Sequence, residues 1–159
     1  MMGFVAYATN SVALATDGTL MTRRSSIDSY QKTRVDHASE TAEDYVEAID
    51  DLIEQEGQCR VTTLARRLGI SHVTVSRTLG RLASEGLVST EPYRPIELTE
   101  DGHALAAWAR QRHELVLSFL RALGVPDEVA IPDAEGIEHH CSPATLKAMK
   151  HFLEEHPDS

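Results

Sequence analysis

Cysteine is scarce in this sequence, and the two that occur are far apart. Cys59 and Cys141 lie 82 positions from each other, and no second thiol is near either. A thiolate zinc site needs closely spaced cysteines and a disulfide framework needs several pairs, so both are excluded. Isolated cysteines of this kind are typical of a protein from a reducing cytosol.

Long apolar runs are also missing. Residues 4–15 are mildly apolar, but Thr9, Asn10 and Ser11 interrupt them and no basic residue precedes them. A membrane-spanning helix needs about 20 apolar residues, and a signal peptide needs a basic start. We therefore expect a cytoplasmic protein with no membrane partner. Aromatic residues make up 5% of the 159 residues and hydrophobic residues 42%, which predicts a mainly aliphatic core in one domain or two small ones.

Each of two neighbouring segments lacks charge of one sign. Residues 35–56 contain nine acidic residues and no Lys or Arg, whereas residues 57–84 contain no acidic residue. The net charge of −10 argues against a nucleic-acid partner, but local charge decides the attraction to phosphate within a Debye length. The basic residues of the second segment are Arg60, Arg66, Arg67, Arg77 and Arg81. This segment is therefore a candidate contact for nucleic acid.

The first confidently periodic stretch is residues 41–56, which predicts a helix. Thr41 can cap its start and Gly57 ends it. Its apolar stripe consists of Tyr45, Ile49, Leu52 and Ile53. Asp44 and Glu47 share a different face at i, i+3, either as metal ligands or as ordinary acidity favoured by the helix dipole.

The most specific local pattern is a pair of short helices separated by Gly69. The first is predicted over 61–68, and the second begins after the N-cap Ser71 and continues through Ser84. The second helix exposes small polar and arginine side chains, which is typical of a DNA-binding helix-turn-helix. An ordinary helical hairpin is the alternative, but the absence of acidic residues in 57–84 disfavours it.

A β-hairpin is predicted directly after these helices, with its turn at 92–95. A hairpin in this place makes a winged helix, and Arg94 at its tip is the natural phosphate contact. The alternative is a merely solvated arginine. The predicted DNA contacts are Ser71, His72, Thr74, Arg77, Arg81 and Arg94.

Three more helices are predicted towards the C-terminus. Thr99 caps a long one that runs to about Leu123, and a short one follows in which Pro132 is expected to break or kink the chain. Ser142 precedes a proline and caps a last helix that runs to about Glu155.

A metal site is predicted from residues 133–140. On a helix, Glu135, Glu138 and His139 fall at i, i+3 and i+4 and share one face, where a divalent cation would have three anchor points. The alternative is a solvated acidic face. His113, on the long helix, is a further candidate ligand or else an ordinary surface histidine.

Together with Asp44 and Glu47, these residues provide four carboxylates and two imidazoles with no sulfur. Four negative charges balance two divalent cations. Hard oxygen donors with some imidazole suit Mn²⁺, and Fe²⁺ or Co²⁺ would be substitutes. Calcium prefers fewer nitrogen ligands and zinc fewer ligands overall.

The order of these motifs resembles the diphtheria-toxin-repressor family of metal-dependent repressors, in its short branch of manganese transport regulators. The resemblance covers about residues 40–156 and depends on three motifs, which are Asp44-Tyr45-Val46-Glu47, Arg112-His113-Glu114, and the segment from Asp133 to His140. The family's iron-responsive branch has methionine and cysteine at the positions of Asp44 and Glu135, and a third domain for which this chain is too short.

The resemblance implies two manganese ions bound by Asp44, Glu47, His113, Glu135, Glu138 and His139. It also implies a mainly α fold with a small β-wing, in which a winged helix-turn-helix domain (39–99) follows a disordered tail (1–38) and precedes an all-helical metal-binding and dimerisation domain (100–159).

We expect a homodimeric, Mn(II)-responsive repressor of manganese-uptake genes that binds a palindromic operator in double-stranded DNA, and not an enzyme with a small-molecule substrate. The alternatives are an Fe(II)-responsive repressor of the same family, a di-metal carboxylate enzyme of the helical-bundle type, and a winged-helix regulator that needs no metal. The enzyme is disfavoured because its fold requires a Glu-x-x-His motif on each of two helices.

Overall fold

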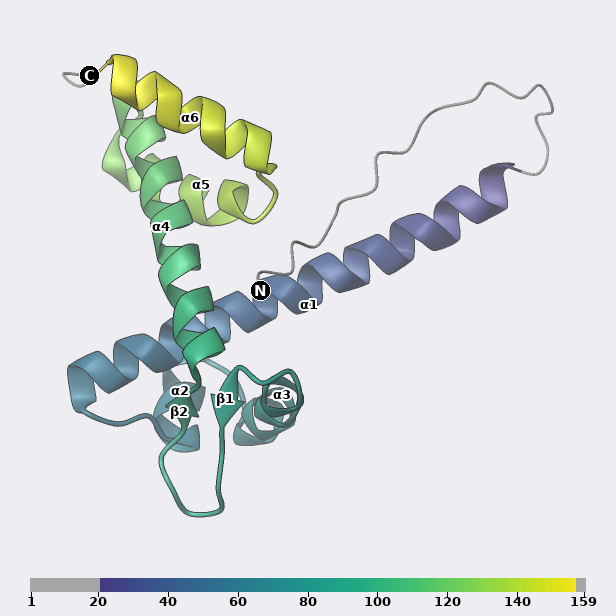
Figure 1. The fold of residues 1–159 in the computed structure, drawn as a ribbon, viewed down its shortest axis with the longest axis vertical. Helices are drawn as coiled ribbons and strands as arrows, with labels where there is room; N and C mark the ends of the chain where they lie inside the picture. Colours follow the sequence, from purple (N-terminus) through teal and green to yellow (C-terminus); the bar gives the residue numbers. More distant parts are fainter. Residues whose placement is uncertain (1–20, 157–159) are drawn as a thin grey trace, which may run out of the picture. The chain divides into compact units, whose positions relative to one another are not determined.

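The computed structural model of the protein describes residues 21–156 and is mainly helical, with one two-stranded sheet (Figure 1). The elements are α1 (Met21–Glu56), α2 (Val61–Leu68), α3 (His72–Ser84), β1 (Val88–Ser89), β2 (Glu97–Leu98), α4 (Glu100–Ala122), α5 (Asp127–Glu138) and α6 (Pro143–Glu155). The predicted fold class, a winged helix-turn-helix followed by a helical domain, is confirmed. Residues His37–Ser159 form one compact unit, which contains every predicted site residue.

Helix α1 differs from the prediction at its start. It begins at Met21, and Thr41 is not its cap, because the Thr41 hydroxyl lies inside the helix and donates to the carbonyl oxygen of His37 at 2.8 Å. Residues 21–40 contain no glycine or proline, so nothing in the sequence interrupts the helix there. Residues 21–38, expected as part of a disordered tail, are thus helical, and residues 1–20 lie outside the described part of the chain.

The helix-turn-helix forms as predicted. Gly69 ends α2 in the left-handed conformation with φ 68°, and the Ser71 hydroxyl caps α3 by accepting a hydrogen bond from the amide of Thr74 at 3.1 Å. Both helices pack on α1 around an aliphatic core. Its fully buried side chains include Ile49, Leu64, Val75 and Leu82.

The wing is short. Strands β1 and β2 are antiparallel, with Val88 paired to Leu98 and Ser89 to Glu97. The amide of Ile96 also donates to the carbonyl oxygen of Cys59 at 2.8 Å, which ties the wing to the loop before α2.

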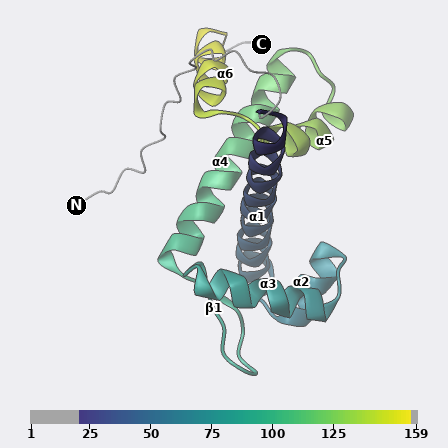
Figure 2. The same cartoon turned by 90° about the vertical axis from the view of Figure 1, so that its right-hand side faces the viewer.

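Helix α4 leads from the wing into the C-terminal helices, where α5 and α6 pack beside it (Figures 1 and 2). Thr99 caps α4 by accepting from the amide of Gly102 at 3.1 Å, as predicted. A second, smaller core lies among these three helices, with Val116, Ala130 and Ala134 fully buried.

Of the two outcomes expected at Pro132, a break or a kink, the break does not occur. Helix α5 continues through Pro132, which lies in its second turn. A proline costs one main-chain hydrogen bond there, and packing of Ala130 and Ala134 on either side of it holds the helix together. None of the helices in the described residues is both long and apolar enough to span a membrane.

Candidate metal centre

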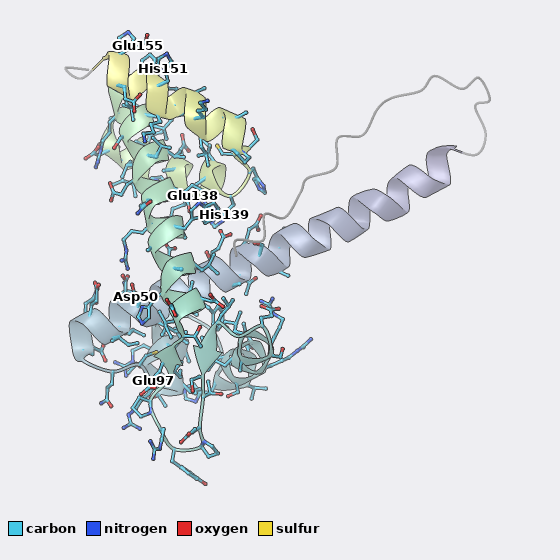
Figure 3. The ribbon with its side chains drawn as sticks, viewed as in Figure 1. Asp50, Glu97, Glu138, His139, His151 and Glu155 are labelled. Atoms are coloured by element: carbon cyan, nitrogen blue, oxygen red, sulfur yellow. The ribbon has the colours of Figure 1, made fainter. Side chains whose placement is uncertain are left out.

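His113 of α4 and Glu135 and Glu138 of α5 form the tightest part of the predicted site. Nδ1 of His113 lies 2.8 Å from Oε2 of Glu138 and 3.5 Å from Oε1 of Glu135. One ligand atom from each of the three residues lies within 4.8 Å of the others, close enough for a single cation to contact all three. Figure 3 labels Glu138 and His139 where α5 meets α4.

His139 directly follows α5 and keeps helical geometry, with φ −64° and ψ −24°. It therefore stays on the same face as Glu135 and Glu138, as the spacing predicted. Its Nε2 atom lies 3.8 Å from Oδ1 of Asp44, which brings the first of the two α1 acids to the site. His140 is exposed, and its Nδ1 lies 3.7 Å from Oε1 of Glu40.

Glu47 is coupled to the other site residues electrostatically, which is seen in its pKa. Its pKa is raised from 4.5 to about 7, first by burial and then by the negative charges of Glu138 and Glu135, against a smaller lowering by Arg110. The pKa of Asp44 is also raised, first by burial and then by Glu135, while His139 opposes the shift. The negative charges of the α5 acids thus act on both acids of α1.

Sequence reasoning missed two buried residues at this place, Glu43 and Arg112. Nη2 of Arg112 donates to Oε2 of Glu43 at 2.7 Å and to Oε1 of Glu138 at 3.1 Å. The three side chains are 7%, 5% and 2% exposed for Glu43, Arg112 and Glu138. The available signals were that Glu43 lies one helical turn before Glu47 and that Arg112 adjoins His113.

The donor set fits a hard divalent cation. Arg112 pairs with Glu43, so four site carboxylates remain, those of Asp44, Glu47, Glu135 and Glu138. The pKa values of Asp44 and Glu47 are raised, first by burial and then also by neighbouring carboxylates, so a cation bound there would relieve repulsion. With two imidazoles and no sulfur, these oxygens match the preferences of Mn²⁺ or Fe²⁺ better than those of softer metals. The residues present therefore fit the predicted manganese ions.

The predicted DNA contacts lie on one exposed part of α3 and on the wing. His72 and Arg77 are exposed, and Ser71 and Thr74 are exposed while their side chains bond each other at 2.9 Å. Arg81 is more constrained, because it pairs with Glu85 at 2.9 Å and donates to the carbonyl oxygen of Ala38 at 3.2 Å. Arg94 is exposed beside Glu91.

These elements define a winged-helix protein with a cluster of carboxylates and histidines between its first helix and a following helical domain. Two family profiles match the chain. One is "Iron dependent repressor, N-terminal DNA binding domain" over residues 37–96, and the other is "Iron dependent repressor, metal binding and dimerisation domain" over residues 99–159. The chain belongs to the iron dependent repressor family. It is accordingly a DNA-binding, dimerising transcriptional regulator and not an enzyme, so the di-metal enzyme considered above is not supported.

Named relatives agree with this family. The chain is 42% identical to the transcriptional regulator MntR of Escherichia coli O157:H7 over 137 residues, which are 86% of this chain and 88% of the relative. It is 44% identical over 133 residues to the protein of the same name from Salmonella typhimurium, covering 84% and 85% of the two chains. A solved structure described as a manganese-dependent transcriptional repressor complex with manganese matches with a TM-score of 0.63 and 30% identity, over 71% of this chain and 52% of that one. The match therefore spans about half the length of that structure.

Proposed function

We propose that the protein is an Mn(II)-responsive transcriptional repressor of manganese-uptake genes, which binds a palindromic operator as a homodimer. The observation that carries this proposal is a cluster with only oxygen and nitrogen donors, shared between a helix of the DNA-binding domain and two helices of the dimerisation domain. The names of the relatives, and the manganese in the similar solved structure, support manganese as the metal.

The proposed ligands are the six residues predicted from the sequence, for two ions per subunit. Asp44 and Glu47 come from α1, His113 from α4, and Glu135, Glu138 and His139 from α5 and its end. Bound Mn²⁺ would supply the positive charge that the carboxylates lack. The absence of sulfur among these donors favours manganese over the softer later metals, and Fe²⁺ and Co²⁺ are expected to bind as substitutes.

The switch follows from the positions of the ligands on the chain. Asp44 and Glu47 belong to the helix on which α2 and α3 pack, whereas the other four ligands belong to the dimerisation domain. When bound metal removes the repulsion between the acids of α1 and those of the dimerisation domain, α1 holds a fixed orientation to α4 and α5. Two recognition helices of a dimer can then match major grooves about 34–36 Å apart.

On DNA, α3 is proposed as the recognition helix. His72, Thr74 and Arg77 are exposed at the face free for base edges and phosphates, and Ser71 lies at its start. Arg94 would contact phosphate from the wing, and Arg81 would do so only by exchanging its present partners.

The test is DNA binding as a function of metal. Duplex DNA would be selected from a random pool by the Mn²⁺-loaded protein, and its affinity measured with EDTA and with increasing Mn²⁺, Fe²⁺, Co²⁺ or Zn²⁺. We expect Mn²⁺ to tighten binding by 10-fold or more, a coupling of about 1.4 kcal/mol that lies within the usual range for such switches. Equal affinity in EDTA and in Mn²⁺ would contradict the proposal.

A matched pair of histidines on α4 sharpens this test. His113→Gln removes a proposed ligand, whereas His103→Gln changes an exposed histidine that pairs with Asp50 at 3.1 Å. Only the first variant is expected to lose the Mn²⁺ response.

A further inference from the structure

One nitrogen of Arg112 makes all the polar contacts of that buried side chain. Nη2 lies 2.7 Å from Oε2 of Glu43, 3.1 Å from Oε1 of Glu138 and 3.0 Å from Nδ1 of His139. These partners come from α1, from α5 and from the residue that follows α5. Arg112 thus connects three elements, and two of the three residues it contacts are proposed metal ligands.

The two oxygens of Glu138 have separate partners. Oε1 accepts from Arg112, and Oε2 faces Nδ1 of His113 at 2.8 Å. Because Arg112 occupies Oε1, the carboxylate plane is fixed with Oε2 turned towards His113 and Glu135. Oε2 is the oxygen left for a cation.

Glu43 orients His139 as Arg112 orients Glu138. Its Oε2 lies 3.1 Å from Nδ1 of His139, while Nε2 of the same ring faces Asp44. If Nδ1 carries the proton, it donates to Glu43 and Nε2 keeps the lone pair that a metal needs. If Nδ1 instead accepts from Arg112, Nε2 carries the proton and cannot be a ligand.

We propose that Glu43 and Arg112 are positioning residues of the metal site. Arg112 fixes Glu138 so that Oε2 is free, and Glu43 holds Nδ1–H of His139 so that Nε2 is free. This inference rests on the proposed function, because it assigns roles toward the metal that the six ligands would bind. Partners of this kind typically change metal affinity 10–100-fold when they are removed.

The surroundings explain why an arginine stands at this position. Its guanidinium carbon lies 4.5 Å from the centre of the Trp108 ring, so the flat cation stacks on an aromatic face. Its Nε has no hydrogen-bond partner among the described residues. Because Nη2 alone makes the polar contacts, a lysine with three donors on one nitrogen can replace part of its role, although its chain is one bond shorter.

The test compares four variants of the full-length protein by direct metal binding. Glu43→Gln and Arg112→Met remove the two positioning groups, and Arg112→Lys is the conservative rescue. The control is Arg121→Met, since Arg121 also joins α4 to a neighbouring helix, through Asp127 of α5 at 2.8 Å, but contacts no proposed ligand among the described residues. Mn²⁺ affinity is read at pH 8 from the EPR signal of the free ion.

We expect Glu43→Gln and Arg112→Met to weaken Mn²⁺ binding 10–100-fold, as removal of such partners usually does. Arg112→Lys should recover part of the loss, and Arg121→Met should stay within about threefold of the parent protein, as for a surface change. A second readout is the ¹⁵N spectrum of the Zn²⁺-loaded protein, in which His139 should be protonated at Nδ1.

Parent-like Mn²⁺ affinity in both Glu43→Gln and Arg112→Met would overturn the inference, as would an equal loss in Arg121→Met or a His139 protonated at Nε2. If Arg112→Met does not fold, the nearly isosteric Glu43→Gln decides the question. These outcomes are separate from the proposed function, which fails only if the parent protein binds DNA equally with and without Mn²⁺.

Discussion

Gly102 is a helical position where alanine should destabilise the protein, contrary to helix propensity. It lies in the first turn of α4, where the amide of Gly102 donates to the capping hydroxyl of Thr99. A methyl group added here would overlap the carbonyl oxygen of Leu87 and would lie 3.1 Å from its carbonyl carbon and 3.3 Å from Cδ2 of Leu98. The Leu87 carbonyl cannot easily retreat, because it accepts a hydrogen bond from the amide of Thr99 at 3.1 Å.

The magnitude follows from two opposing effects. Replacing a helical glycine with alanine usually stabilises by about 0.5–1 kcal/mol. Forcing a methyl group into a filled space costs about 1–3 kcal/mol, and the obstacle here is main chain and not the end of a flexible side chain. We therefore expect Gly102→Ala to lower the free energy of unfolding by up to about 2 kcal/mol, which for a chain of this size corresponds to a fall of up to about 8 °C in Tm.

Gly80 is the matched control. It lies within α3, and an added methyl group there meets no atom within 4 Å among the described residues. Gly80→Ala should raise the unfolding free energy by about 0.5–1 kcal/mol. Both variants would be unfolded thermally in EDTA and followed by circular dichroism at 222 nm. A Gly102→Ala protein as stable as the parent would refute the argument from the contact with Leu87.

Three further predictions concern function. Arg77→Ala should weaken DNA binding at low salt and reduce the slope of log binding constant against log salt concentration by about 1. Arg81→Ala should change this slope less, because Glu85 and the carbonyl oxygen of Ala38 already hold the Arg81 side chain. Electrophoretic mobility shifts at several salt concentrations check both variants. Glu47, with a pKa raised to about 7 by burial, stays protonated to higher pH in the folded metal-free protein than in the unfolded chain. Its contribution to stability is therefore complete below pH 4.5 and is lost as pH rises to about 7. Over the same range Mn²⁺ affinity should rise by up to about tenfold per pH unit, because the ligand has to lose its proton, and calorimetry at pH 6 and pH 8 would measure this rise. An Mn²⁺ affinity that does not change with pH would count against Glu47 as a ligand. Asp44→Met puts a soft donor in place of a hard one and should shift the metal preference from Mn²⁺ towards Fe²⁺ or Co²⁺ in the DNA-binding titration, and an unchanged preference would contradict the donor argument.

The caps of the helices were predictable because capping is local. Ser71, Thr99 and Ser142 each accept a hydrogen bond from the amide three residues later, as their sequences indicated. Thr41 has the same kind of local sequence but is helical. The difference is what precedes it, since a glycine, a β-strand and a turn precede Ser71, Thr99 and Ser142 respectively, whereas a stretch without breakers precedes Thr41.

The candidate site was predictable where helical periodicity alone brings residues together. Glu135, Glu138 and His139 share a face because of their spacing on α5, and the structure keeps them there. The partnership of Glu43 with Arg112 joins residues 69 positions apart, and no local pattern specifies it. Periodicity assigned Asp44 and Glu47 to one face of α1 and placed Glu43 one turn before Glu47, but the role of Glu43 depends on the arginine that α4 brings to it.

Two arginines of α4 hold α1 through acids outside the proposed ligand set. Arg112 binds Glu43, and Arg110 binds Asp50 and Asp51. These pairs form without a cation, so they already join the DNA-binding and dimerisation domains before metal binds. What remains unbalanced is the repulsion of Asp44 and Glu47 against the acids of α5. The proposed metal therefore has to reverse only a local repulsion at a contact between α1 and α4–α5 that already exists. A change of a few kcal/mol in the free energy of that contact is enough to shift the population of the DNA-binding state strongly.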